Sequence, residues 1–153
     1  MQMQGPCGQR STSYVYAGDE VAEGTTLSLK NDLTVAHALQ IDPESQVLIS
    51  PRIVVKGQTY TPGTILLKSL DEEPLFMQIE RILIVDHRKI MQCHQMDIIK
   101  FDGHLNMFLL EPTGKMNFVC SEDLIYKWPQ ISRPQINGEI LVMMYCADDV
   151  WIL

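Results

Sequence analysis

The clearest pattern in this sequence is a series of apolar, β-branched runs separated by glycine, proline, asparagine and aspartate. Runs of this kind, bounded by turn residues, are typical of antiparallel β-strands. The ranges expected to form strands are 25–29, 47–49, 52–55, 64–68, 75–85, 90–99, 104–110, 115–120, 139–146 and 150–153. The sequence therefore predicts a mainly β fold, a small barrel or sandwich of six or more short antiparallel strands with one short helix.

The two longest runs, residues 75–85 and 90–99, are predicted to form a hairpin across the polar tip His87-Arg88-Lys89. In the first run, polar and apolar residues alternate up to Arg81, and the alternation then ends. Alternation indicates one solvated face, whereas an uninterrupted apolar run indicates burial on both faces of a sheet. The second half of this strand is therefore expected to lie in the core.

Two further signals lie in the second half of the chain. The turn residues Pro112-Thr113-Gly114 predict another hairpin, between residues 104–110 and 115–120. The hydroxyl of Ser121 is placed to cap the free amides of a helical turn, and Pro129 prevents much continuation. One or two helical turns are expected there.

The chain divides into three parts by composition. Residues 1–13 are rich in Gly, Gln, Ser and Thr and are expected to be a flexible tail. Residues 14–46 are a poorly defined N-terminal segment or linker, with a short helix from Asp32 to Leu39 capped by Asp32 or the residue before it. Residues 47–153 are expected to form the β-rich globular domain. A linker before that domain would make the chain one piece of a longer protein.

Length, composition and charge limit the functional classes. With 153 residues, 46% apolar and 20% charged, the chain is expected to fold as one globular domain. The net charge is -7 and the longest basic run is Arg88-Lys89, so direct nucleic-acid binding is disfavoured unless folding assembles a local patch. No apolar run could cross a bilayer, and the first residues lack a secretory signal. An intracellular protein, nuclear or cytoplasmic, with reduced thiols and no membrane contact is expected.

One stretch of the sequence resembles a known type of module. It consists of Tyr60-Thr61-Pro62-Gly63-Thr64-Ile65-Leu66-Leu67 and, after an acidic loop, Phe76-Met77-Gln78-Ile79-Glu80-Arg81-Ile82. The stretch resembles the opening strands of bromo-adjacent homology (BAH) domains, which implies a β-rich chromatin-reader or protein-interaction module. With Phe101-Asp102-Gly103-His104 and Glu122-Asp123-Leu124, it is also similar to uncharacterised animal proteins from transposon-like open reading frames. That second resemblance implies no established activity.

The leading hypothesis is a non-catalytic protein-interaction module that binds a basic peptide or a chromatin partner. The loop Asp71-Glu72-Glu73 is a cluster of carboxylates, and such clusters attract cations over a longer range than neutral surfaces do. Tyr60 and Phe76 flank this loop in the matched strands and are the candidate aromatic contacts for a cation. The other aromatic side chains that could contribute are Tyr126, Trp128, Tyr145 and Trp151.

The alternative hypothesis is an enzyme whose site is built from dispersed residues around His94, His104 and Asp102. The spacing of histidines, cysteines and acids matches no metal motif, so neither a metal nor another cofactor is expected. Cys120 is the best candidate for a nucleophile, although a buried structural thiol fits the same pattern. No phosphate-binding loop or serine-hydrolase elbow is present. A third hypothesis is a domain of a transposon-derived protein whose activity lies in another domain.

Overall fold

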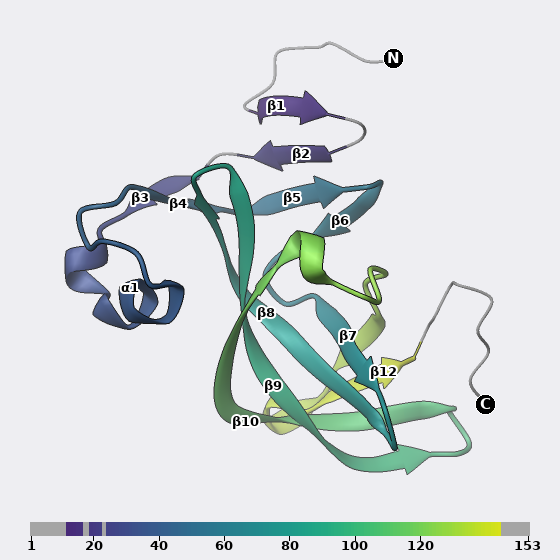
Figure 1. The fold of residues 1–153 in the computed structure, drawn as a ribbon. Coiled ribbons are helices and arrows are strands. Elements are labelled where there is room, and N and C mark those ends of the chain that lie inside the picture. Colours follow the sequence, from purple (N-terminus) through teal and green to yellow (C-terminus); the bar gives the residue numbers. More distant parts are fainter. Residues whose placement is uncertain (1–11, 17–18, 23, 145–153) are drawn as a thin grey trace.

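The structure, a computed structural model, describes residues 12–16, 19–22 and 24–144 (Figure 1). It is mainly β, as predicted. Its strands are β1 (Thr12–Tyr16), β2 (Asp19–Ala22), β3 (Thr25–Leu27), β4 (Val47–Ser50), β5 (Arg52–Val55), β6 (Gln58–Tyr60), β7 (Ile65–Leu70), β8 (Pro74–Val85), β9 (Arg88–Asp102), β10 (Met107–Cys120), β11 (Ile131–Pro134) and β12 (Ile140–Met143). Its helical elements are η1 (Leu29–Asn31), α1 (Leu33–Leu39), η2 (Ser121–Asp123) and η3 (Ile136–Gly138).

The described strands form two antiparallel sheets. The larger sheet has eight strands in the order β11-β12-β10-β9-β8-β4-β3, with β7 paired to β8. The smaller sheet joins β1, β2, β5 and β6 in that order. Figure 1 shows that the long strands β8, β9 and β10 bend, so that the larger sheet curls into a half-barrel. The prediction of a small, antiparallel, barrel-like β fold with one short helix is thus confirmed.

Strand β8 connects the two ends of the half-barrel. On one side it pairs with β9, from Phe76 opposite Met96 to Val85 opposite Arg88. On the other side its first half pairs with β7 and its last residues pair with β4. The acidic loop lies just before Pro74, at the start of β8, and the polar turn of the predicted hairpin lies just after Val85, at the other end of the strand.

A β-bulge explains why the alternation in β8 ends at Arg81. Ile79 lies opposite Cys93 and Arg81 lies opposite Gln92, so Glu80 is an extra residue on β8. An extra residue exchanges the faces to which the following side chains point. Apolar side chains beyond the bulge are buried on both faces, as the uninterrupted apolar run predicted.

Three clusters of buried side chains hold the sheet together. The central cluster consists of Val21, Ile53, Val55, Tyr60, Leu66, Met77, Ile79, Ile82, Met91, Cys93 and Leu124. The tip cluster consists of Ile65, Leu67, Phe76, Met96, Leu110, Ile140 and Val142. The helix cluster consists of Leu29, Val35, Ala36, Val47, Leu83, Val85 and Ile90. Successive residues of β7 and β8 enter different clusters, because neighbouring side chains of a strand point to opposite faces.

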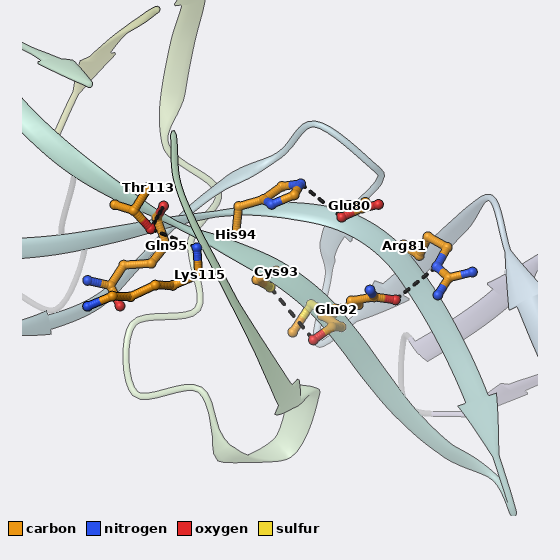
Figure 2. Close-up of polar contacts among 9 residues, drawn as sticks. Glu80, Arg81, Gln92, Cys93, His94, Gln95, Thr113 and Lys115 are labelled. Carbon is orange, nitrogen blue, oxygen red and sulfur yellow. Dashed lines mark hydrogen bonds and ion pairs between the residues drawn. The ribbon is translucent and has the colours of Figure 1, made fainter. Parts of the chain in front are cut away.

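Helix α1 begins where the sequence predicted it. Asp32 caps the helix by accepting a hydrogen bond from the backbone N–H of Val35. The same carboxylate pairs with the guanidinium of Arg81 on β8 at 3.0 Å. Arg81 also donates to the side-chain oxygen of Gln92 on β9 at 2.8 Å (Figure 2). These contacts fasten the start of the helix to the sheet. In the described part of the chain, no helix has the length and apolarity needed to span a membrane.

The second predicted hairpin is wrong. Residues 107–120 form a single strand, β10, and both halves of it pair with β9. The hydroxyl of Thr113 donates a hydrogen bond to the backbone carbonyl of Gln95, and Gly114 adopts a φ of 84°. These residues make a bulge in the middle of the strand and do not reverse the chain, because the strand on either side keeps the same neighbour.

Two other local predictions change in detail. Strand β10 begins at Met107 and not at His104, because Asp102 accepts hydrogen bonds from the backbone N–H groups of His104 and Leu105 and so forms a turn. Ser121 opens the predicted helical turn, which is a 3-10 turn without a side-chain cap.

Some predicted segments lie outside the described residues. Strand β12 accounts for residues 140–143 of the strand predicted at 139–146, and the described chain ends at residue 144. The predicted edge strand at 150–153 lies outside it, with Tyr145 and Trp151. Residues 1–11 of the predicted tail also lie outside.

Candidate functional site

The acidic loop predicted to bind a partner is the tip of the β7–β8 hairpin. Leu70 and Pro74 lie opposite each other, and Asp71, Glu72 and Glu73 form the loop between them. All three acidic side chains are exposed. The tip cluster holds both strands beneath the loop, so the three carboxylates are presented from a packed base.

Tyr60 and Phe76, the two predicted aromatic contacts, are core residues. Tyr60 is 1% exposed in the central cluster and Phe76 is 0% exposed in the tip cluster. Neither ring can touch a partner in this structure. The sequence does not separate the two roles, because aromatic residues are common both in strand cores and at interfaces.

An exposed aromatic ring lies at the same end of the sheet as the acidic loop. The ring of Phe76 lies 5.6 Å from that of Phe108 on β10. Phe108 in turn lies 4.9 Å from Phe101 on β9, which is 50% exposed. Ile99 and Leu105 in the same hairpin are also exposed. The three rings connect the tip cluster to the surface, and Phe101 is a candidate contact that the sequence analysis missed.

Two further carboxylates extend the acidic surface. Asp97 on β9 and Glu111 on β10 lie directly opposite each other, and both are exposed. Asp97 follows Met96, the residue that pairs with Phe76 near the start of β8. Lys100 is exposed further along β9, so the negative charge is local. We call this surface the acidic tip: Asp71, Glu72, Glu73, Asp97 and Glu111.

The dispersed His/Asp site of the enzyme hypothesis is not assembled. His94 lies on β9 with its Nε2 atom 2.9 Å from the carboxylate of Glu80 (Figure 2). His104 is exposed in the β9–β10 turn, where Asp102 is occupied by backbone N–H groups. The strand between His94 and Asp102 spans on the order of 25 Å. The three side chains therefore do not converge on one point.

The thiol pKa is raised at both described cysteines. Burial raises the pKa of the Cys93 thiol to about 12. Burial is also the main cause that raises the pKa of Cys120. The guanidinium of Arg88 lowers that pKa, and the carboxylates of Asp123 and Glu122 raise it. A thiol must ionise to act as a nucleophile or a metal ligand. Within the described residues, no group of three or more His, Cys, Asp or Glu side chains is placed to hold a metal ion.

The other end of β8 carries a basic pocket that the sequence analysis did not predict. It is a cavity of about 330 Å³ between the β5–β6 turn, the β8–β9 turn and the segment that follows β10. Its lining residues are Val55, Lys56, His87, Arg88, Lys89, Ser121, Glu122 and Lys127. Four cationic residues and one acidic residue are thus among those that line this cavity, although the net charge of the chain is -7.

Two tight turns fix the backbone on either side of the basic pocket. Lys56 and Gly57 join β5 to β6 with φ values of 52° and 83°, and Asp86 and His87 join β8 to β9 with φ values of 48° and 68°. Positive φ at both central residues matches the twist of a two-residue hairpin turn. Aspartate and histidine adopt this left-handed conformation more readily than most residues, although less readily than glycine. The β8–β9 turn therefore stores some backbone strain beside the pocket.

A buried tyrosine fixes the third wall of the pocket. The hydroxyl of Tyr60 donates a hydrogen bond to the backbone carbonyl of Lys127, 67 residues later in the chain. Because the ring of Tyr60 lies in the central cluster, this bond ties the segment that carries Lys127 to the core. Tyr60 is therefore a positioning residue for the pocket.

The sequence contained one signal for this pocket. Arg88-Lys89 is the longest basic run and was predicted at a hairpin tip. The other two cations, Lys56 and Lys127, are isolated in the sequence, and the fold alone brings them to the same cavity. A count of charges along the chain therefore could not find the site.

No family model matches the chain, and no significant match was found among curated proteins or solved structures. The charged surfaces at the two ends of β8 are the features of the described residues that bear on function. The resemblance of residues 60–82 to BAH domains stays an expectation.

Proposed function

We propose that this protein is a non-catalytic interaction module whose acidic tip binds a basic, extended segment of a protein partner. The observation that carries the proposal is the Asp97–Glu111 pair, two exposed carboxylates held opposite each other on neighbouring strands. Like charges in this position destabilise a sheet. A cationic partner neutralises this repulsion, so relief of the repulsion adds to the free energy of binding.

The acidic loop supports the proposal through its position. Asp71, Glu72 and Glu73 are exposed, and they project from a hairpin whose strands are packed in the tip cluster. A surface that is already ordered loses little conformational entropy on binding. Clustered charge of one sign also steers a partner of the opposite sign and suppresses wrong partners.

The exposed apolar side chains at the same end suit long cationic side chains. The half-exposed ring of Phe101 offers a face to an arginine or lysine head group, and Ile99 and Leu105 offer contact to their methylene stems. A histone tail is one basic, extended segment of this kind. The resemblance to BAH domains favours such a chromatin partner.

The test is a fluorescence anisotropy titration of the full chain with a labelled, unstructured peptide rich in lysine and arginine. We expect the triple variant Asp71→Ser/Glu72→Ser/Glu73→Ser to bind the peptide about tenfold more weakly than wild type at low salt, because each exposed ion pair contributes about 0.2–1 kcal/mol. The difference should shrink as the salt concentration rises.

The matched control is Asp42→Ser/Glu44→Ser/Asp123→Ser, which removes the same number of exposed carboxylates away from the acidic tip. It should bind the peptide almost as well as wild type. Equal weakening in both variants would mean that the peptide senses only net charge, and the acidic tip would then not be a specific site.

A further inference from the structure

The basic pocket has no role in the function proposed above, and its charge is opposite. Among the described residues that line it, Glu122 is the only acidic one, and four are cationic: Lys56, Arg88, Lys89 and Lys127. Like charges that converge on one cavity repel each other, and an anion between them reverses that repulsion. The three lysines also take part in interactions within the chain, so it is their combined charge, and not an unpaired group, that favours an anionic ligand.

We propose that the basic pocket binds the phosphate group of a phosphorylated serine or threonine in a protein partner. Such a group carries a charge of about -1.5 to -2 at neutral pH and has three strong acceptor oxygens. Arg88 supplies a planar guanidinium that suits two oxygens at once, and the lysines supply compact charges. Ser121 adds a hydroxyl donor to the lining. These residues come from three separate segments that meet at the cavity.

The lining favours a phosphate carried by a larger molecule over a free metabolite. Val55 is the only apolar residue among the described residues of the lining, whereas sites for free small molecules are mostly apolar with a few polar groups. The cavity of about 330 Å³ is also at the lower limit of such sites, which span about 300–1,000 Å³. It has room for a phosphate and the side chain that carries it, while the rest of the partner lies outside.

A nucleic acid fits this pocket less well. Nucleic-acid binding depends on many phosphates neutralised along a groove or a stripe of basic residues. Here acidic side chains flank the cations, with Asp86 in the adjoining turn and Asp123 next to Glu122. These carboxylates repel the successive phosphates of a polynucleotide, whereas a single phosphate enters between the cations.

The basic pocket and the acidic tip are far enough apart to act independently. They lie beyond opposite ends of β8, whose 12 residues span up to about 35 Å. The Debye length is about 8 Å at physiological ionic strength, so charge at one end has little effect at the other. Failure of the phosphate proposal therefore leaves the acidic tip untouched, and the reverse also holds.

The test is an NMR titration of the full chain with three probes: a short neutral peptide that contains one phosphoserine, the same peptide with serine, and inorganic phosphate. We expect the phosphopeptide to shift the backbone amide signals of Arg88, Lys89 and Glu122 in a saturable way. Inorganic phosphate should shift the same signals with lower affinity, and the serine peptide should shift none of them. The double variant Arg88→Gln/Lys89→Gln should lower the affinity for the phosphopeptide about tenfold or more.

The matched control is Lys100→Gln/Arg133→Gln, which removes the same charge at exposed strand positions outside the pocket. It should keep the affinity within about twofold of wild type. Lys56→Gln, in a different turn, is the second pocket variant if the double variant does not fold, and it should also weaken binding. The pocket variants, Arg88→Gln/Lys89→Gln and Lys56→Gln, should not affect binding of the basic peptide at the acidic tip.

Four outcomes would overturn the proposal. The first is an equal response to the phosphorylated and unphosphorylated peptides, and the second is an affinity unchanged by the pocket variants. The third is a response to inorganic phosphate without any response to the phosphopeptide, which would exclude a phosphorylated partner. The last is tighter binding of a short single-stranded oligonucleotide than of the phosphopeptide, which would assign the surface to nucleic acid.

Discussion

The two ends of strand β8 differ in how their charge is assembled. At the acidic tip, three of the carboxylates are consecutive residues of one loop, Asp71-Glu72-Glu73. At the basic pocket, the cations come from three segments that are far apart in the sequence. A consecutive cluster is present in any conformation of the chain, whereas a convergent cluster exists only in the folded state. Charge counted along a sequence therefore detects the first kind of surface and misses the second.

The supports of the two ends also differ. The strands beneath the acidic loop are held by an apolar cluster with the ring of Phe76 inside it. One wall of the basic pocket is held by a hydrogen bond from Tyr60 to the carbonyl of Lys127. Removing a buried ring from an apolar cluster lowers the free energy of unfolding substantially. Removing a single hydrogen bond lowers it little, but frees the segment that the bond held in place. A substitution at Phe76 should therefore mainly lower stability, whereas a substitution at Tyr60 should mainly weaken binding at the basic pocket.

The largest effect is expected at the acidic end, from Phe76→Ala. Loss of a fully buried ring from the tip cluster should lower the free energy of unfolding by about 3–5 kcal/mol, measured by denaturation in guanidinium chloride. The half-exposed Phe101 is the matched control, and Phe101→Ala should cost less than half as much. Equal and small losses in both variants would mean that Phe76 does not support the acidic tip.

The fold class and part of the architecture could be predicted from the sequence, whereas the strand order and the second sheet could not. The pairing of β8 with β9 follows from two long apolar runs with a polar tip between them, and helix α1 follows from the cap at Asp32. The failure at residues 104–120 has a local cause. Pro112-Thr113-Gly114 is suited to a turn and equally to a bulge, and only the continuous pairing with β9 decides between the two.

The candidate site was less predictable. The acidic loop is visible as three consecutive letters, but the opposed pair Asp97 and Glu111 depends on strand register. Register changes at bulges, and a shift of one residue exchanges the faces of a strand. The exposure of Phe101 and the burial of Phe76 likewise depend on how the sheet curls, because both lie in strands of similar composition.

A smaller effect on stability is expected at the basic end, from Tyr60→Phe. The change keeps the ring in the central cluster and removes the hydrogen bond to the carbonyl of Lys127, so the free energy of unfolding should fall by only about 1 kcal/mol. The segment that carries Lys127 should then move more freely, and binding of the phosphoserine peptide should weaken several-fold, while binding of the basic peptide stays unchanged.

The control for the tyrosine change is Tyr126→Phe, which removes the hydroxyl of a partly buried tyrosine that packs against the tip cluster. It should leave the affinity for the phosphoserine peptide unchanged. If Tyr60→Phe destabilises the chain and the affinity for phosphopeptide is nevertheless unaltered, Tyr60 is a structural residue without a positioning role.

The smallest effect is expected at the acidic tip, where the repulsion between Asp97 and Glu111 should lower stability and favour binding of a basic partner. Glu111→Gln removes the carboxylate opposite Asp97, so it should raise the free energy of unfolding by about 0.2–0.5 kcal/mol at low salt, with a smaller gain at high salt. The same variant should bind the basic peptide more weakly.

Glu73→Gln is the control, because it removes a carboxylate from the loop, where no strand partner lies opposite. It should weaken binding without the gain in stability. A Glu111→Gln variant that loses stability would show that the pair is not repulsive, and the acidic tip would then lack the strain that a basic partner relieves.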